Sequence, residues 1–112
     1  MTSTFKAIAA ALMAAGAFGA QAGTQTGTIS QLTVRASDGL IILYMNGTPS
    51  DRATCAAHQP YWMIKDENST SGKQQLAQLV TAYAAGRTVN IVGMGTCTRW
   101  GDGEDIDLVN LL

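Results

Sequence analysis

The densest group of possible metal ligands in this sequence is a run of four acids: Asp102, Glu104, Asp105 and Asp107. Calcium prefers six to eight oxygen ligands supplied by a loop that can wrap around the ion. The run lacks the D-x-[DN]-x-[DN]-G spacing and the late glutamate of an EF-hand loop. Asp105 and Asp107 also alternate with apolar residues, which is typical of a strand with one solvated face. We therefore expect a polar turn and a solvated strand face here, and no metal or other cofactor.

Nucleophilic catalysis would have to use His58, the only histidine, with a serine or with Cys55. A catalytic triad requires that nucleophile, base and orienting group converge, and no G-x-S-x-G motif accompanies this histidine. The GMG motif at 93–95 precedes a cysteine and a further strand, whereas a phosphate cradle needs a helix N-terminus. Its glycines are better explained by a positive φ or by close backbone approach beside Cys97. The sequence therefore predicts no catalytic residue and no enzyme.

Large side chains of the types that favour interfaces and sugar stacking fall on or near expected loops: Tyr61, Trp62, Arg99 and Trp100. Tyr44 and Met45, on a neighbouring strand, add to this group. We predict that these residues bind a ligand, either a glycan or a protein. In the alternative, Trp62 belongs to the core and Trp100 packs over a disulfide, which would leave no such surface.

The N-terminal residues 1–22 have the order of a secretory signal peptide. One basic residue, Lys6, precedes an uncharged run that closes on Ala20-Gln21-Ala22; these are an n-region, an h-region and an A-x-A cleavage site. The run is too short to span a bilayer, and it has no polar stripe, which argues against an amphipathic helix. We therefore predict a signal peptide at 1–22, a single domain at 23–112, no membrane span, and export to the periplasm or the medium.

Without the leader the chain carries six basic and eight acidic residues, a formal charge of −2. This balance argues against a nucleic-acid or anionic-membrane partner, which requires a clustered basic face. A domain of about 90 residues buries only around two-thirds of its unfolded surface and is marginal without a covalent link. Cys55 and Cys97 are the only cysteines, and an even number in a small exported chain indicates a disulfide.

The mature chain contains several runs with strand character. Five strands are expected, at 28–36, 40–47, 61–65, 88–95 and 104–112, after a loose lead-in at 23–27. The first changes its apolar parity, which indicates a bulge near Ser30-Gln31. The second is apolar on both faces and needs a second cover, either the helix or a neighbouring subunit. In the last strand, Ile106 and Leu108 share one parity and are expected to face the core.

One amphipathic helix is expected between the third and fourth strands. Thr70-Ser71 offers an N-cap and Gly86 a C-terminal glycine, and the apolar face comprises Leu76, Leu79, Val80 and Tyr83. A helix with one apolar face packs against a sheet or closes the end of a barrel. The order β-β-β-α-β-β is that of a small five-stranded OB-like barrel. The alternative is an open antiparallel sheet with the helix on its face.

The pattern G-K-x-x-L-x-x-x-x-x-A-x-x-x-G-R-x-V-x-I-x-G-x-G-x-C runs from Gly72 to Cys97 and continues through Trp100-Gly101-Asp102. It resembles a group of small exported bacterial proteins of uncharacterised function. The exported size, the element order and the disulfide are similar to those of the receptor-binding B subunits of subtilase-cytotoxin-like AB5 toxins. That resemblance implies an OB-fold, assembly into a homopentamer and glycan binding, and it assigns no particular residue of this chain to the glycan. The alternative is a small periplasmic structural or stress-related envelope protein without a ligand of its own.

Overall fold

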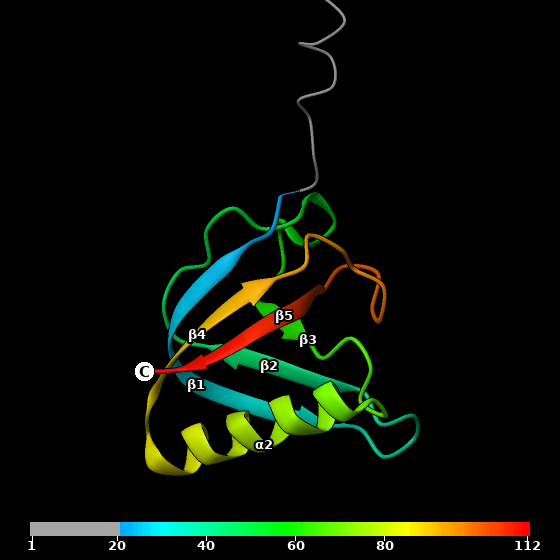
Figure 1. Ribbon diagram of the computed structural model, residues 1–112. Coiled ribbons are helices and arrows are strands. Elements are labelled where there is room, and N and C mark those ends of the chain that lie inside the picture. The colour runs from blue at the N-terminus through cyan, green and yellow to red at the C-terminus, as the bar shows by residue number, and fades with distance from the viewer. Residues whose placement is uncertain (1–20) are drawn as a thin grey trace, which may run out of the picture.

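The computed structural model describes residues 21–112, so most of the predicted signal peptide lies outside the described residues. Figure 1 shows five strands wrapped into a barrel with one helix across its lower end. The elements in chain order are β1 (Thr24–Val34), β2 (Ile41–Met45), the 3-10 turn η1 (Thr54–Ala56), β3 (Tyr61–Met63), α2 (Thr70–Ala85), β4 (Thr88–Gly93) and β5 (Glu104–Leu111). In residues 21–112 no helix is long and apolar enough to cross a membrane.

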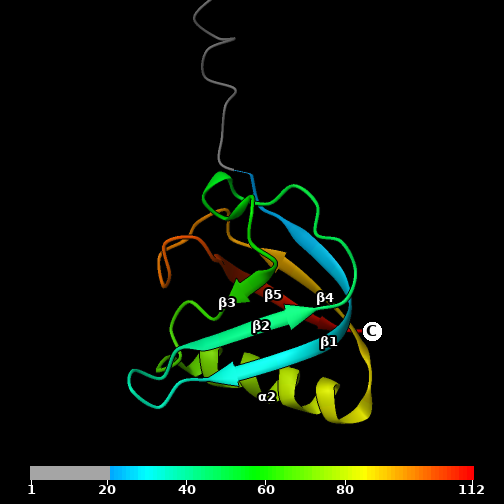
Figure 2. The same cartoon turned by 180° about the vertical axis from the view of Figure 1, so that it is seen from behind.

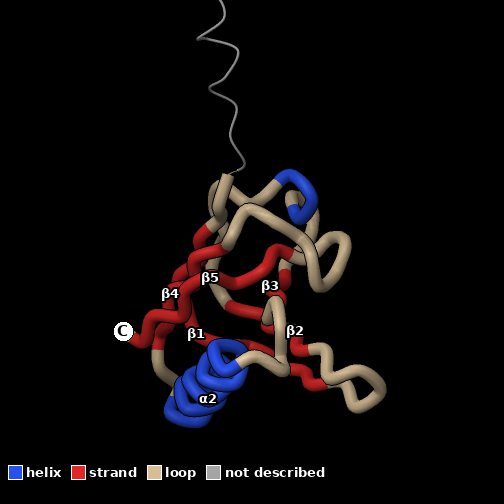
Figure 3. The backbone as a smooth tube through the Cα atoms, turned by 45° about the vertical axis from the view of Figure 1, so that its right-hand side comes forward, coloured by secondary structure: helices blue, strands red, loops and turns tan. Residues whose placement is uncertain are grey.

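The strands close in the order β1-β2-β3-β5-β4, and β4 pairs back with β1. Neighbouring strands are antiparallel except β3 and β5, which are parallel. Figure 2 shows β1 and β2 in front with α2 below them, and Figure 3 shows loops gathered at the opposite end. The predicted OB-like barrel with one helix is therefore confirmed, and the open-sheet alternative is excluded because the ring of strands is closed.

The strand β1 serves both sides of the barrel. Its first half pairs with β4 and its second half with β2, and the register shifts between Ile29 and Gln31. The bulge predicted near Ser30-Gln31 is therefore confirmed, and it lets the strand bend around the barrel. The expectation of a loose lead-in at 23–27 is wrong, because the backbone of these small polar residues is paired with β4.

The ends of α2 are set by one serine and one glycine. The Ser69 hydroxyl accepts a hydrogen bond from the Gly72 backbone N–H at 2.9 Å, so the N-cap lies one residue before the predicted Thr70-Ser71. A Cβ at Gly72 would lie 2.0 Å from the Asp66 carbonyl oxygen, so this first turn requires glycine. Gly86 ends the helix in the left-handed conformation, with φ of 63°, as predicted.

The apolar face predicted for α2 is only partly buried. Leu79 is fully buried and Ala82 is 1% exposed, whereas Val80 and Tyr83 are 51% and 53% exposed. The helix lies across an end of the barrel (Figures 1 and 2), so a narrow stripe containing Leu79 and the small Ala82 makes the contact with the core.

A second bulge changes which residues of β5 face the core. Val92 pairs with Leu108 and Gly93 with Ile106, which leaves Asp107 as an extra residue on β5. The apolar parity shifts at that point, so the core contains Ile106 and Val109 while Leu108 is 49% exposed. The expectation that Leu108 faces the core is therefore wrong.

A disulfide closes the loop end of the barrel. Cys55 in η1 is bonded to Cys97 in the β4–β5 connection, with a Cα–Cα distance of 6.3 Å. The predicted pairing is confirmed, and it joins two connections that are 42 residues apart in the sequence.

Candidate binding face

The outer surface of β2 and β3 carries two aromatic residues side by side. Along β2, Leu43 points into the core, while the next residue, Tyr44, is half-buried on the other side of the strand. Tyr44 is paired with Tyr61 of β3, and the two ring centroids are 5.7 Å apart with the planes at 65°. Opposite residues in an antiparallel pair share a face. This pair therefore forms an aromatic edge-to-face contact on the outside of the barrel.

Asp102, from the β4–β5 connection, binds Tyr61 of this pair. The Tyr61 hydroxyl donates a hydrogen bond to Asp102 Oδ1, and Gln59 Nε2 donates to Oδ2 at 2.9 Å. The pKa of the Tyr61 hydroxyl is raised, first by its burial and then by its hydrogen bond to the Asp102 carboxylate and the negative charge there. The nearby Trp100 side chain acts in the opposite direction on this pKa. The carboxylate thus fixes the orientation of the Tyr61 ring.

Trp100 stands at the tip of the same connection. Its side chain is 42% exposed, and the guanidinium carbon of Arg35 lies 5.3 Å from the ring centroid, within the range of a cation–π contact. Trp100 and Gly103 form an isolated antiparallel bridge, so the tip is a tight turn. The name aromatic face is used below for five residues: Tyr44, Gln59, Tyr61, Trp100 and Asp102.

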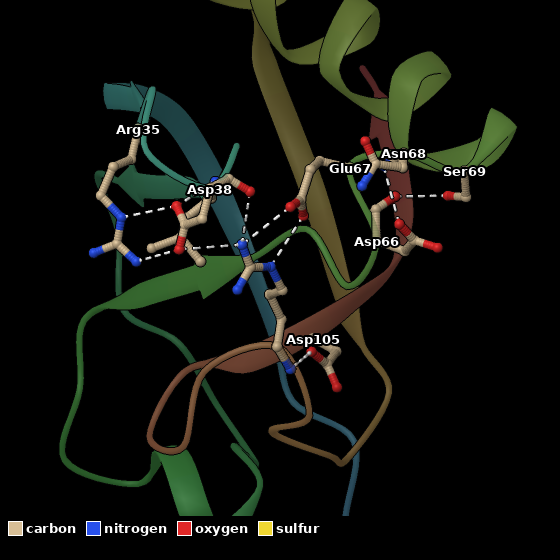
Figure 4. Close-up of polar contacts among 9 residues, drawn as sticks. Arg35, Asp38, Asp66, Glu67, Asn68, Ser69 and Asp105 are labelled. Atoms are coloured by element: carbon tan, nitrogen blue, oxygen red, sulfur yellow. Dashed lines mark hydrogen bonds and ion pairs between the residues drawn. The ribbon is translucent and has the colours of Figure 1, made fainter.

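Arg99, which precedes Trp100 in the chain, joins three connections. It donates from Nε and Nη2 to the two carboxylate oxygens of Glu67, both at 3.0 Å, and from Nη2 to the Asp38 carbonyl oxygen at 3.3 Å. Asp38 in turn pairs with Arg35 at 2.6 Å (Figure 4). The hydrogen bond from Arg99 lowers the pKa of Glu67, and that from Arg35 holds the pKa of Asp38 well below its usual range. Arg99 therefore holds the β1–β2, β3–α2 and β4–β5 connections together.

The residues predicted to bind a ligand differ in their exposure and in their contacts. Tyr61 and Trp100 contribute to the aromatic face, whereas the guanidinium of Arg99 is bound to Glu67. Trp62 is fully buried, and its Nε1 donates to Gln25 Oε1 at 2.8 Å. The alternative in which Trp62 is a core residue is therefore the one found, and Trp62 is removed from the surface set. Met45 is buried as well.

Asp105 is an internal anchor of the β4–β5 connection, and the prediction that it lies on a solvated strand face is wrong. It is fully buried. Its Oδ2 accepts from both the hydroxyl and the backbone N–H of Thr98 and from the Thr96 hydroxyl, at 2.7–2.9 Å, and Oδ1 accepts from the Arg99 N–H at 3.3 Å. Burial would raise the pKa of this carboxyl, but the hydrogen bonds outweigh it and lower the pKa. Asp107, two residues later, is exposed as predicted.

The other acids do not converge on one point. Among residues 21–112 no three histidine, cysteine or acidic side chains are grouped as a metal site would require. Glu104 is fully buried, and a Cβ on Gly93 would lie 1.7 Å from its Oε2. Gly95 has a φ of 75°. Close approach at Gly93, to Glu104 and not to Cys97, and a positive φ at Gly95 thus account for the GMG motif. His58 is exposed just after η1.

An open groove of about 360 Å³ lies elsewhere on the barrel, between the first turn of α2 and β5. Gln75 of α2 donates to the Asp107 carbonyl oxygen at 2.8 Å beside it. The groove has no aromatic residue in its lining and contains none of the residues predicted to bind a ligand. The aromatic face is therefore the stronger candidate for a ligand site.

Two residues of the aromatic face were missed from the sequence as ligand-binding candidates. The sequence around Gln59 contains no motif that indicates a ligand site, and the acidic run that contains Asp102 suggests only a metal site. Their partners are 43 and 41 residues away in the chain, so only the closed barrel brings them together. Comparison of the chain with protein-family models, curated proteins and solved structures finds no match, so the candidate site is assigned from its own chemistry.

Proposed function

We propose that this protein is an exported, non-enzymatic binding module that holds a glycan against the aromatic face. The observation that carries the proposal is the set of contacts around Tyr61, whose ring meets Tyr44 and whose hydroxyl binds the Asp102 carboxylate beside Trp100. OB-folds bind oligosaccharides and oligonucleotides on the second and third strands and the adjoining loops, and the aromatic face has that position. Aromatic rings stack on the apolar side of a sugar, while polar neighbours bind its hydroxyls.

The polar groups of the aromatic face retain capacity for a ligand. Each oxygen of Asp102 accepts one hydrogen bond from the protein, whereas a carboxylate offers about four acceptor sites. The Tyr61 hydroxyl uses its proton toward Asp102 and keeps acceptor capacity. Both protein groups therefore act as acceptors toward a ligand. Two neighbouring hydroxyl groups of a sugar suit this arrangement, because each can donate a hydrogen bond.

Charge favours a glycan over a nucleic acid as the ligand. The only cation beside Trp100 that the described contacts give is Arg35, and it is paired with Asp38. Nucleic-acid binding needs several free cations that neutralise phosphates, and the whole chain has a formal charge of −1. A neutral or weakly charged sugar fits this surface better.

A glycan array probed with the mature protein tests the proposal. We expect binding to a restricted set of glycans, and Trp100→Ala should weaken the strongest interaction by about 10- to 100-fold, because a central aromatic anchor contributes that much. Tyr83→Ala is the matched control, since Tyr83 is an exposed aromatic residue on α2 at 53% exposure, and it should leave binding unchanged. Equal losses in the two variants would refute the aromatic face as the site.

The same samples establish the assembly. The resemblance to AB5 toxin B subunits implies a homopentamer, and the proposal includes copies of this chain as partners. Light scattering would give a pentamer-sized particle if that holds, and multivalent display would then raise the apparent affinity for a glycan surface.

A second candidate is an envelope protein without a ligand. The interlocking of Arg99 with Glu67 and Asp38 and the full burial of Trp62 favour it, because these groups act on the fold itself. The 42% exposure of Trp100 argues against it. A monomeric mass together with an array that contains no ligand would select this second candidate.

A further inference from the structure

Glu104 is a fully buried carboxylate that is bound by three separate segments of the chain. Its Oε2 accepts hydrogen bonds from the backbone N–H groups of Gly23, at 2.9 Å, and Gly95, at 3.2 Å. Its Oε1 accepts from the Ala53 N–H at 2.7 Å. A buried charge normally has a charged partner, yet all three donors here are neutral amides.

Arg52, the cation on which the charge of Glu104 acts, is engaged by other groups. The Arg52 guanidinium donates to the carbonyl oxygens of Gln59 and Tyr61 and lies over the Trp62 ring, 4.2 Å from its centroid. No described hydrogen bond or ion pair joins Arg52 to Glu104, although the charge of Glu104 raises the pKa of Arg52 against the larger effect of burial. The carboxylate therefore sits in an internal site whose charge is only partly compensated.

The site fits a glycine at position 23 and no larger residue. A Cβ there would lie 2.8 Å from the Arg52 Cα and 2.9 Å from Glu104 Oε1. The Gly23 carbonyl oxygen also accepts from the Gly93 N–H at 2.8 Å, so the residue is held on both sides. Ala22 is exposed while Gly23 is buried, so the chain passes from the surface into the barrel at the peptide bond between them, just before it enters β1 (Figure 1).

That same bond is the cleavage site expected for the signal peptide. We propose that Glu104 is the built-in counter-ion for the α-ammonium group that cleavage between Ala22 and Gly23 creates. Water is the co-reactant: the C–N bond breaks, the Ala22 carbonyl carbon receives the hydroxyl and the Gly23 nitrogen receives the hydrogen. At neutral pH the products are a carboxylate on the released leader and an ammonium on the mature domain, which places a positive charge 2.9 Å from Glu104 Oε2.

Cleavage therefore converts a hydrogen bond from a neutral amide to the Glu104 carboxylate into a buried ion pair. The charged side chain against the Gly23 nitrogen is Glu104 from β5. Arg52 of the β2–β3 connection meets Gly23 with its backbone, while its guanidinium lies over the Trp62 ring. Gly93 and Gly95, which also contact this site, are uncharged. The ion pair fastens the start of β1 to β5 and raises the pKa of the amine. Its contribution is fully present below the unfolded pKa of an α-amine, about 7.7–8.0, and is lost as the pH rises through the higher folded pKa.

Three forms of the domain test this inference: the Gly23–Leu112 chain with a free amine, the same chain N-acetylated, and a chain that retains Gln21 and Ala22. Acetylation keeps the N–H but removes the charge. In urea unfolding at pH 6.5 we expect the free-amine form to have a folding equilibrium constant about tenfold larger than either blocked form, because the ammonium adds its attraction for the Glu104 carboxylate to a hydrogen bond that the blocked forms also donate. The advantage should disappear near pH 11.

Glu104→Gln introduced into all three forms should abolish the differences between them, whereas Asp105→Asn, a buried acid on the same strand, should weaken all forms equally. If Glu104→Gln does not fold, the pH series on the unmutated forms decides alone. Equal unfolding midpoints for the free and acetylated chains at pH 6.5, or a first residue other than Gly23 in the exported protein by mass spectrometry, would overturn the inference. None of these readouts depends on a glycan.

Discussion

The role of a carboxylate in this protein is decided by the donors around it. Asp105 and Asp107 are the same residue type on one strand, yet Asp105 is fully buried with two hydroxyls and two backbone N–H groups directed at it, whereas Asp107 is exposed. Thr96 and Thr98 precede β5, so Asp105 folds the connection back onto its own strand. Because Asp105 binds the Thr98 and Arg99 backbone, it also fixes where Arg99 and Trp100 lie.

Asp105→Asn should destabilise the fold by roughly 1–3 kcal/mol at neutral pH, because the new amide NH₂ would face hydroxyl and N–H donors that need an acceptor. The pKa of Asp105 is lowered in the folded state. Its stabilising effect is therefore present above the unfolded pKa of about 3.9 and is lost as the pH falls through the folded value. Chemical denaturation between pH 2 and 7 should show the gap between wild type and variant closing in acid.

Asp107→Asn is the matched control for that measurement, since the side chain is exposed two residues away. It should change the free energy of unfolding by less than about 0.5 kcal/mol at every pH. If Asp105→Asn were equally mild, the carboxylate would not anchor the connection.

At the scale of elements, only part of the apolar face predicted for α2 is buried. Leu79 and Val80 both belong to the predicted apolar face of α2, but only Leu79 enters the core. Because α2 lies across the end of a barrel, the contact it makes is narrower than a flat sheet would give. The small residues Gly72 and Ala82 complete the buried stripe.

Leu79→Ala should lower the free energy of unfolding by about 2–5 kcal/mol, since it removes a fully buried side chain and leaves a cavity. Val80→Ala, one residue later and 51% exposed, should change it by no more than about 0.5 kcal/mol. Urea denaturation of both variants against wild type measures the contrast. Similar losses in the two would mean that Val80 is covered in solution, as a partner copy on this face would require.

Local signals explain which features of the fold could be predicted. The β1 bulge was visible because the parity change lies within a single run of residues, and Gly86 ends α2 because only the local backbone is involved. The bulge at Asp107 was not visible, because it arises from the register with β4. The burial of Trp62 likewise depends on Gln25, 37 residues earlier, which provides the acceptor for its indole N–H.

The candidate site was predictable only in part, for the same reason. Tyr61 and Trp100 were identified by residue type, while Gln59 and Asp102 gain their place from a contact between the β2–β3 and β4–β5 connections. Arg99 was expected to meet a ligand, but Glu67 from a third connection occupies its guanidinium. Residue type suggests a binding function, whereas the closed barrel decides which groups are free to perform it.

At the scale of the whole molecule, the loop end of the barrel is bound together by both covalent and polar links. The disulfide joins η1 to the β4–β5 connection, and Glu104 joins the start of β1, the segment before η1 and the same connection. The opposite end is closed by α2. The aromatic face lies between these two ends, on the outer surface of β2 and β3.

Removal of the disulfide should therefore lower the unfolding free energy of the whole domain. The double variant Cys55→Ser/Cys97→Ser should lose about 2–4 kcal/mol of unfolding free energy, because the bond closes a loop over a sequence separation of 42 and the chain-entropy contribution is then on the order of 4 kcal/mol. Urea denaturation with and without reductant separates this effect from the substitutions themselves: reductant should bring wild type down to the variant and leave the variant unchanged. If the urea unfolding midpoint of the wild type does not change on complete reduction, the polar contacts at this end stabilise the domain without the disulfide.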